Sequence, residues 1–159
     1  MLLPSRYATV SGVGVSETSP LNAFDNALQD CELGDYNLVP VSSIIPKEAV
    51  RVDRLDLEPG SIVFVVMAKA EGYGGQKLSA GLAWAKPEGR IGIVMELHRV
   101  DPKEETTQEL LEKDVREASK ARGLPDSEIR FLETSLDVPN GHFGCVICCL
   151  ALTLQPAAG

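Results

Sequence analysis

The sequence predicts an α+β fold, a four-layer αββα sandwich in which two mainly antiparallel sheets pack face to face with a helix outside each. Only 5% of its 159 residues are aromatic, whereas 44% are hydrophobic. The core must therefore consist of Val, Ile, Leu and Ala, a composition that favours sheet. Several short apolar segments have the length and pattern of strands, and two segments have helical periodicity. A chain of this length is expected to form one domain, residues 1–159.

The first part of the chain is expected to contain a strand followed by a helix. Residues 6–15 predict a strand that ends in a glycine-rich turn. Ser19 and Pro20 then begin a helix, as its N-cap and its first residue, and the helix runs to about Cys31. One face of this helix is apolar and contains Ala23, Phe24, Ala27, Leu28 and Cys31. Asp25 lies at the edge of that face.

The middle of the chain predicts two strands separated by a loop. Residues 37–45 form a short strand, and Pro40 limits its pairing because proline lacks an amide hydrogen. Residues 47–58 are charged and irregular, which is typical of a surface loop. Residues 61–70 are almost continuously apolar, as in a strand that is covered on both faces. A hairpin turn is expected at Gly74-Gly75.

The remaining elements are four strands and a second helix. Residues 77–86 alternate, with one face formed by Leu78, Ala80, Leu82 and Trp84. Residues 90–98 alternate again, with one face formed by Gly92, Val94, Glu96 and His98. The segment 104–122 predicts a helix, because its acidic start and basic end match the helix dipole. Residues 128–136 and 142–154 predict the last two strands.

Charge and hydropathy exclude several classes of protein. The net charge of −8 repels phosphate backbones, so we expect no nucleic-acid partner. The longest apolar run falls short of the ~20 residues that a membrane helix needs, so no membrane association is expected. The first residues lack the charged and apolar regions of a signal peptide. These features predict a cytoplasmic protein.

The cysteines and histidines do not form a recognisable metal site. Cys145 and Cys148 have CxxC spacing, but on a strand they point to opposite faces. No second CxxC or pair of histidines completes a zinc site, so we expect buried, reduced core cysteines. His98 and His142 are isolated and are expected to be structural or surface residues.

Several sequence stretches together resemble one enzyme family. They are GVGVSET (12–18), LNAFDNAL (21–28), YNLVPVSSIIP (36–46), PGSIV (59–63) and GIVMELH (92–98). In this order they resemble the pyruvoyl-dependent arginine decarboxylases of archaea and some bacteria. The resemblance covers about the first two thirds of the chain, and the combination of LNAFDNAL with NLVPVSSIIP is its most specific part. A Ser-Ser pair without this context would be an ordinary turn.

The resemblance implies that the chain cuts itself between Ser42 and Ser43. The products would be a small chain, 1–42, and a large chain, 43–159, whose first residue is a pyruvoyl group derived from Ser43. That covalent ketone would serve as the electron sink in the decarboxylation of L-arginine to agmatine and CO2, the role that PLP has elsewhere. Neither PLP nor a metal is then needed. The resemblance also implies a homotrimer with sites between neighbouring subunits, and a role in polyamine synthesis.

Three further residues match the family's functional positions. Glu96 would be the acid that returns a proton to the α-carbon, and its apolar surroundings would raise its pKa. Asp25 would bind the guanidinium of arginine through two parallel hydrogen bonds. The Asn37 amide would donate to the Ser42 carbonyl as its oxyanion forms. Without the resemblance, Glu96 and Asp25 would be solvated surface carboxylates and Asn37 a turn residue.

Two alternative functions remain open at this point. One is a pyruvoyl decarboxylase that acts on another amino acid. Asp25 discriminates between the two substrates, because a carboxylate at this position favours the guanidinium of arginine. The other is an unprocessed, non-catalytic paralogue that serves as a binding or structural subunit. In that case Ser43 would stay a serine and Glu96 would only fill space.

Overall fold

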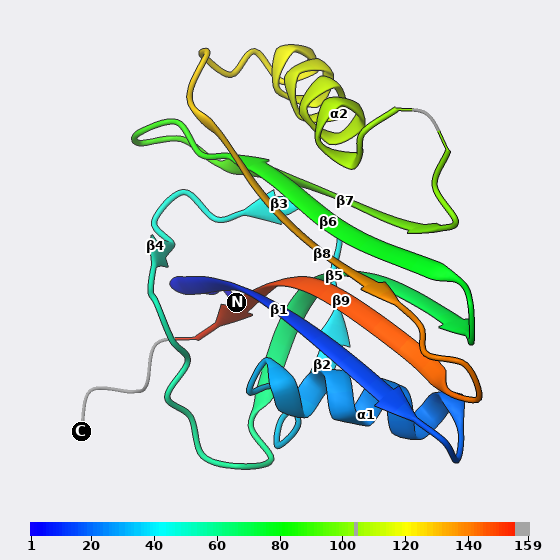
Figure 1. Ribbon diagram of the computed structural model, residues 1–159. Helices are drawn as coiled ribbons and strands as arrows, with labels where there is room; N and C mark the ends of the chain where they lie inside the picture. The colour runs from blue at the N-terminus through cyan, green and yellow to red at the C-terminus, as the bar shows by residue number, and fades with distance from the viewer. Residues whose placement is uncertain (104, 155–159) are drawn as a thin grey trace.

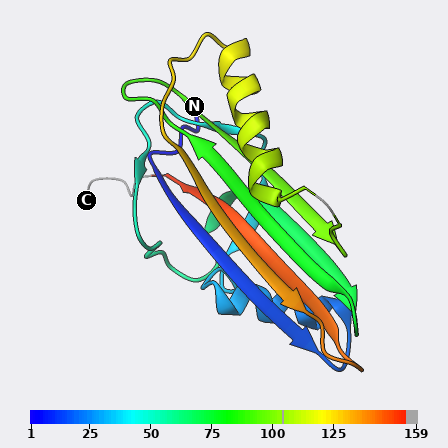
Figure 2. The same ribbon diagram turned by 45° about the horizontal axis from the view of Figure 1, so that its top comes forward.

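The computed structural model describes residues 1–103 and 105–154 of the chain. Two sheets lie face to face, with helix α1 on the outer side of one and helix α2 on the outer side of the other (Figures 1 and 2). This arrangement confirms the predicted αββα sandwich. Among the described residues, no helix is both long and apolar enough to cross a membrane.

One sheet has five strands and the other has four. The first consists, in spatial order, of β2 (Asn37–Pro40), β5 (Ile62–Tyr73), β9 (Phe143–Thr153), β1 (Arg6–Ser16) and β4 (Val50–Arg51). Its central strand β9 is antiparallel to β1 and β5, whereas the short edge strands β2 and β4 run parallel to their neighbours. The second sheet is antiparallel and consists of β3 (Ile44–Ile45), β7 (Gly92–Val100), β6 (Lys77–Ala85) and β8 (Ile129–Asp137).

The two helices start where local sequence signals allow. Helix α1 (Pro20–Asp30) has Ser19 as N-cap, whose side chain accepts from the Asn22 amide. Helix α2 (Thr107–Ala121) begins with a capping box formed by Thr106 and Glu109. It therefore starts later than predicted, and residue 104 of the predicted helix lies outside the described residues. The apolar face of α2 buries Leu111 and Val115 against the four-stranded sheet.

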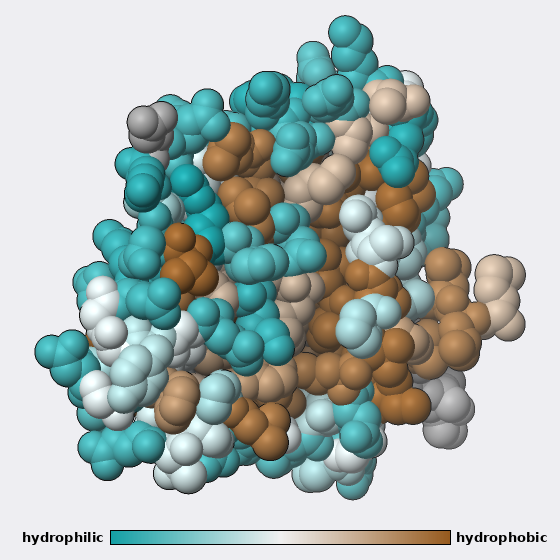
Figure 3. All heavy atoms as spheres, turned by 90° about the vertical axis from the view of Figure 1, so that its right-hand side faces the viewer, coloured by the Kyte–Doolittle hydropathy of each residue, from teal (hydrophilic) through white to brown (hydrophobic). Residues whose placement is uncertain are grey.

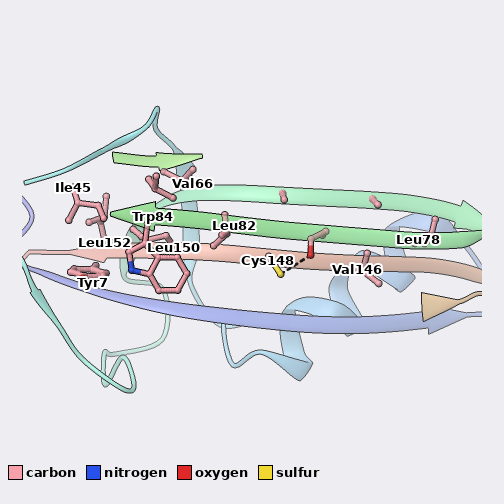
Figure 4. Packing of buried hydrophobic residues seen from close by; sticks show 14 of the residues in the cluster. Tyr7, Ile45, Val66, Leu78, Leu82, Trp84, Val146, Cys148, Leu150 and Leu152 are labelled. Carbon is pink, nitrogen blue, oxygen red and sulfur yellow. Dashed lines mark hydrogen bonds between the residues drawn. The ribbon is translucent and has the colours of Figure 1, made fainter. Parts of the chain in front are cut away.

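Most large apolar side chains are buried between the layers, although a band of apolar side chains is visible on one face of the molecule (Figure 3). Figure 4 shows how β6 and β9 face each other across the space between the sheets. As the alternation predicted, the inward face of β6 consists of Leu78, Ala80, Leu82 and Trp84. A second cluster lies between the five-stranded sheet and α1, and contains Ala23, Ala27, Val63 and Ile147.

All four cysteines are free and buried, as the sequence predicted. Cys31, Cys145 and Cys149 belong to the cluster beneath α1, whereas Cys148 lies between the sheets. The Cys148 thiol donates to the Ala80 carbonyl over 3.1 Å (Figure 4). Burial raises the pKa of Cys145 and Cys148 to about 12, so both thiols stay protonated at neutral pH.

The predicted glycine-rich turn after the first strand is wrong, because β1 continues through Gly12 and Gly14 to Ser16. These glycines allow α1 to pack directly on β1. A Cβ atom on Gly12 would overlap the Ala27 carbonyl, and one on Gly14 would overlap the Ala23 carbonyl. The glycines therefore serve close packing between helix and strand rather than a turn. The turn predicted at Gly74-Gly75 is present, but it is not a hairpin, because the strands it joins, β5 and β6, belong to different sheets and do not pair.

The strand predicted at 37–45 is in fact two strands that belong to different sheets. β2 lies at the edge of the five-stranded sheet and β3 at the edge of the four-stranded sheet. Between them, Val41 to Ser43 cross from one sheet to the other. The residue pattern describes burial, not the choice of sheet, and so could not reveal this crossing. The loop predicted at 47–58 contains the two-residue strand β4.

The contact between β1 and α1 yields a stability prediction. Gly14→Ala should destabilise the protein by about 3 kcal/mol, because the methyl group overlaps helix backbone that cannot move independently. The melting temperature should fall by about 10 °C. As a control, Gly123→Ala places its methyl group in open space at a φ of 62° and should cost about 1 kcal/mol. Equal losses from the two variants would contradict this account of the packing.

Candidate active site

The peptide bond between Ser42 and Ser43 spans the gap between the two sheets. On one side, the Val41 amide donates to the Val65 carbonyl of β5 over 2.9 Å. On the other, the Ser43 carbonyl accepts from the Val94 amide of β7 over 2.9 Å. Ser42 lies between these two attachments and is exposed. The crossing segment is therefore held at both ends and open to solvent in its middle.

A cavity of about 510 Å³ opens at the same edge of the sandwich. It forms there because β2 pairs with β5 only as far as Val65, which leaves the following part of β5 uncovered on that edge. Its walls come from α1, β2, β5 and β7, and include Phe24, Leu28, Asn37, Val41, Lys69 and Glu96. Val41 brings the crossing segment to the cavity wall.

Glu96 contributes a carboxyl group to this cavity. It follows Val94 by two residues on β7 and therefore shares the face of the strand that is directed at the other sheet. The side chain as a whole is exposed, yet partial burial of the carboxyl raises its pKa above the ordinary value. The charge of His98 lowers the pKa by a smaller amount. Glu96 thus keeps its proton to a higher pH than a free glutamate does.

Lys69 lies in the cavity wall, and sequence reasoning did not single it out. Its ammonium lies 4.4 Å from the centre of the Phe24 ring and 3.5 Å from the Glu71 carboxylate. The signal in the sequence was a cation inside the otherwise apolar segment 61–70. A lysine in this place is a point charge that can attract an anionic group of a ligand.

Asn37 is held at the other end of β2 from the Ser pair. Its side-chain amide donates to the Gly60 carbonyl over 2.8 Å, and its backbone amide donates to the Ser61 carbonyl over 2.9 Å. Five residue steps of extended chain, about 16 Å, separate Asn37 from Ser42. The expected donation to the Ser42 carbonyl is therefore not made within this chain. Asn37 instead joins the start of β2 to the turn that precedes β5.

Asp25 does not line the cavity of its own chain. It is exposed on α1, although the adjacent Phe24 is part of the cavity wall. Its neighbour Asn26 donates to the Val15 carbonyl over 2.9 Å, which fixes the helix to the end of β1. The structure thus brings Glu96 and the Ser42–Ser43 crossing to one edge and leaves Asp25 on the outer surface.

This arrangement combines three chemical features at one edge. The crossing segment presents a serine hydroxyl next to a constrained, exposed peptide bond. The cavity beside it contains a carboxyl group with a raised pKa and a lysine. Its remaining wall is largely apolar, with side chains such as Phe24, Leu28 and Met67. Such a site suits proton transfer to a bound organic molecule.

Comparison with known proteins identifies relatives over most of the chain. Residues 6–155 match the family model described as pyruvoyl-dependent arginine decarboxylase. A protein of that name from Methanopyrus kandleri is 39% identical over 147 residues, which cover 92% of this chain and 95% of the relative. Its counterpart from Methanothermobacter thermautotrophicus is 36% identical over 136 residues, 85% of this chain and 89% of the relative. The one from Methanocaldococcus jannaschii is 37% identical over 125 residues, 74% and 70% of the two chains.

Proposed function

The chain belongs to the pyruvoyl-dependent arginine decarboxylase family, and we propose that it makes its pyruvoyl group by cleaving itself between Ser42 and Ser43. The enzyme decarboxylates L-arginine and yields agmatine and CO2. The observation that carries the proposal is the crossing of Val41 to Ser43 between two sheets, with a hydrogen bond to a different sheet on either side.

The proposed cleavage uses only groups of the crossing segment and water. The Ser43 Oγ attacks the Ser42 carbonyl carbon, the C–N bond breaks, and the hydroxyl proton passes to the released nitrogen. Loss of the Ser43 α-proton then breaks the Cβ–O bond of the resulting ester, which releases chain 1–42 with a terminal carboxylate. Water replaces the nitrogen of the remaining dehydroalanine, which leaves a ketone and ammonia. The two hydrogen-bonded ends support this step because they limit the motion of the reacting atoms.

The fold can keep both fragments together after cleavage. Chain 1–42 contains β1, α1 and β2. β1 pairs with β9 along its whole length, from Arg6 opposite Thr153 to Ser16 opposite Phe143. β2 pairs with β5, and α1 is packed on β1 and β9. We therefore propose that the processed protein remains one domain built from two chains.

In the proposed reaction, Glu96 acts on the bound substrate as the acid. The pyruvoyl group, once formed, would supply a ketone able to take up the α-amine of arginine and the electron pair left by CO2. Glu96 donates a proton to the α-carbon, and its raised pKa supports this role. The electron sink is part of the chain, so this mechanism requires neither PLP nor a metal.

We propose that Asp25 binds the guanidinium of arginine in the site of a neighbouring subunit of a trimer. Its exposed position outside its own cavity supports this assignment. Large apolar side chains on β2, β3, the crossing segment and the start of β5 are also exposed, and they include Val39, Val41, Ile44 and Ile62. A second subunit would bury them. For Asn37, we propose that its bond to Gly60 fixes the start of β2, which indirectly positions the crossing segment.

The cleavage proposal predicts two fragments in the purified protein. Under denaturing conditions, mass spectrometry should find chains 1–42 and 43–159. Under native conditions the two chains should stay associated, because β1 remains paired with β9. Ser43→Ala should fold, remain one chain and lack activity, because it has no nucleophile. Ser42→Ala is the matched control and should still be cleaved, since Ser42 contributes only its carbonyl. A single unmodified chain in an active preparation would rule out this origin of the ketone.

Removal of the proposed acid should affect catalysis but not processing. Glu96→Gln should be cleaved normally and should lose about 100-fold or more in kcat, measured as CO2 release from arginine. Glu117→Gln, an exposed carboxyl on α2, should retain the wild-type rate. A Glu96→Gln enzyme with a kcat close to that of wild type would remove Glu96 from the mechanism.

The pKa shift of Glu96 predicts the pH dependence of kcat. The acid must be protonated to act, so kcat should fall as the pH rises through the raised pKa of Glu96. His98→Gln removes a charge that lowers this pKa, and should therefore move the fall to higher pH. Steady-state rates across a pH series check both statements. If kcat of His98→Gln fell at a lower pH than kcat of the wild type, the assignment would be contradicted.

Asp25→Asn should raise the KM for arginine by about tenfold to 100-fold, because charge-assisted hydrogen bonds to the guanidinium are lost. Asp35→Asn is a control that removes another exposed carboxylate. Parallel assays with ornithine, histidine and aspartate test whether arginine is the substrate that this site selects. Unchanged arginine affinity in Asp25→Asn would show that another group holds the guanidinium.

A further inference from the structure

A second cavity, of about 220 Å³, lies at the edge of the sandwich opposite the Ser42–Ser43 crossing. The crossing is at the β2 and β3 edges, whereas this cavity is at the β4 and β8 edges. Figure 4 shows Tyr7 and Trp84 near one another at one end of the core. The cavity is lined by Tyr7, Arg51, Trp84, Lys86, Ser127 and Arg130, with Glu128 beside them. The proposed mechanism uses none of these residues.

Three cations converge on this cavity although the protein has a net charge of −8. The Arg51 guanidinium lies 5.6 Å from the centre of the Trp84 ring and donates to the Thr9 hydroxyl over 3.2 Å. Lys86 donates to the backbone carbonyls of Lys47 and Arg90, over 2.8 and 3.4 Å. Among the described residues, neither Arg51 nor Lys86 forms an ion pair. No carboxylate in residues 1–103 and 105–154 therefore neutralises their charges.

The third cation is only weakly paired. Arg130 lies 3.7 Å from the Glu128 carboxylate, and the two side chains are 49% and 76% exposed, so solvent screens their attraction. The cavity thus contains three positive charges and one negative charge. Mutual repulsion among cations in a confined space opposes folding unless an anion offsets it.

Neutral hydrogen-bond donors complete the cavity wall. The Ser127 hydroxyl is buried and has no hydrogen-bond partner among the described residues. Rotation about its single side-chain torsion can redirect it to an acceptor. Tyr7 is buried as well, and burial raises the pKa of its phenol, although Arg51 and Arg130 lower it by smaller amounts. Tyr7 therefore remains a protonated donor at neutral pH.

We propose that this cavity binds a small polyvalent oxoanion of the phosphate class. Two guanidinium groups and an ammonium match the charge of such an anion, and guanidinium forks fit the spacing of its oxygens. The volume corresponds to about seven water molecules at about 30 Å³ each, enough for a phosphate group with a small substituent or with water. The bound anion also gives the Ser127 hydroxyl a hydrogen-bond acceptor.

The bound anion connects the two sheets at this edge. Arg51 lies on β4, which pairs with β1 in the five-stranded sheet, whereas Arg130 lies on β8 of the four-stranded sheet. An anion shared by both arginines bridges the layers and attaches the loop around β4. Binding should therefore raise the melting temperature of the whole protein by mass action.

Calorimetric titration of the purified, full-length protein with inorganic phosphate, at constant ionic strength, tests the proposal. Saturable binding is expected, with a rise in melting temperature of about 5 °C or more at 100 times the dissociation constant. Arg51→Gln and Arg130→Gln should each weaken binding about tenfold or more. Arg90→Gln changes the net charge equally but its side chain does not line the cavity, so it should bind phosphate as the wild type does. A second titration with glycerol phosphate shows whether an ester fits.

Ser127→Ala separates binding from folding. It removes a buried hydroxyl that has no partner among the described residues, so the anion-free variant should be at least as stable as wild type, while phosphate binding should weaken several-fold. Absence of saturable binding by both ligands would overturn the proposal. So would an equal loss of phosphate binding in Arg90→Gln and Arg51→Gln, because that result would indicate only diffuse attraction.

Discussion

The chain between β2 and β3 is tied to a different sheet at each end, and the rest of the site depends on this constraint. The Val41 amide completes the pairing with β5, and the Ser43 carbonyl begins the pairing with β7. Neither sheet can shift relative to the other without straining the three residues between them. A peptide bond in this position has few accessible conformations. That restriction is what an intramolecular attack by a neighbouring hydroxyl needs.

The sandwich is arranged so that cleavage at this point is compatible with a stable fold. The central strand β9 pairs with β1 on one side and with β5 on the other, and these two strands come from opposite sides of the proposed cut. The close fit of α1 on Gly12 and Gly14 adds to this attachment. The same edge leaves part of β5 uncovered, which creates the cavity that receives Glu96 and Lys69. The proposed cleavage and the proposed proton transfer would thus use one open edge.

Much of the fold could be predicted from residue patterns, because alternation identified the inward face of β6 and helical periodicity identified the apolar face of α1. The crossing could not be predicted in this way, since consecutive apolar residues such as Val41 and Ile44 do not indicate which sheet they join. Helix packing explains Gly12 and Gly14, which local sequence rules assign to a turn. Glu96 could be proposed from its place in GIVMELH, whereas Lys69 required the structure. The role proposed for Asp25 depends on contacts that one chain does not contain, whereas the role proposed for Asn37 depends on its bond to Gly60, which required the structure.

The central claim is that the reactive ketone arises at position 43, at the crossing between the sheets. Reduction with cyanoborohydride in the presence of arginine, followed by peptide mapping, tests it most directly. We expect the reagent to attach the substrate amine covalently to the first residue of the chain that begins at position 43. Recovery of an intact peptide that spans Ser42 and Ser43 from active enzyme, or attachment at any other residue, would contradict the claim.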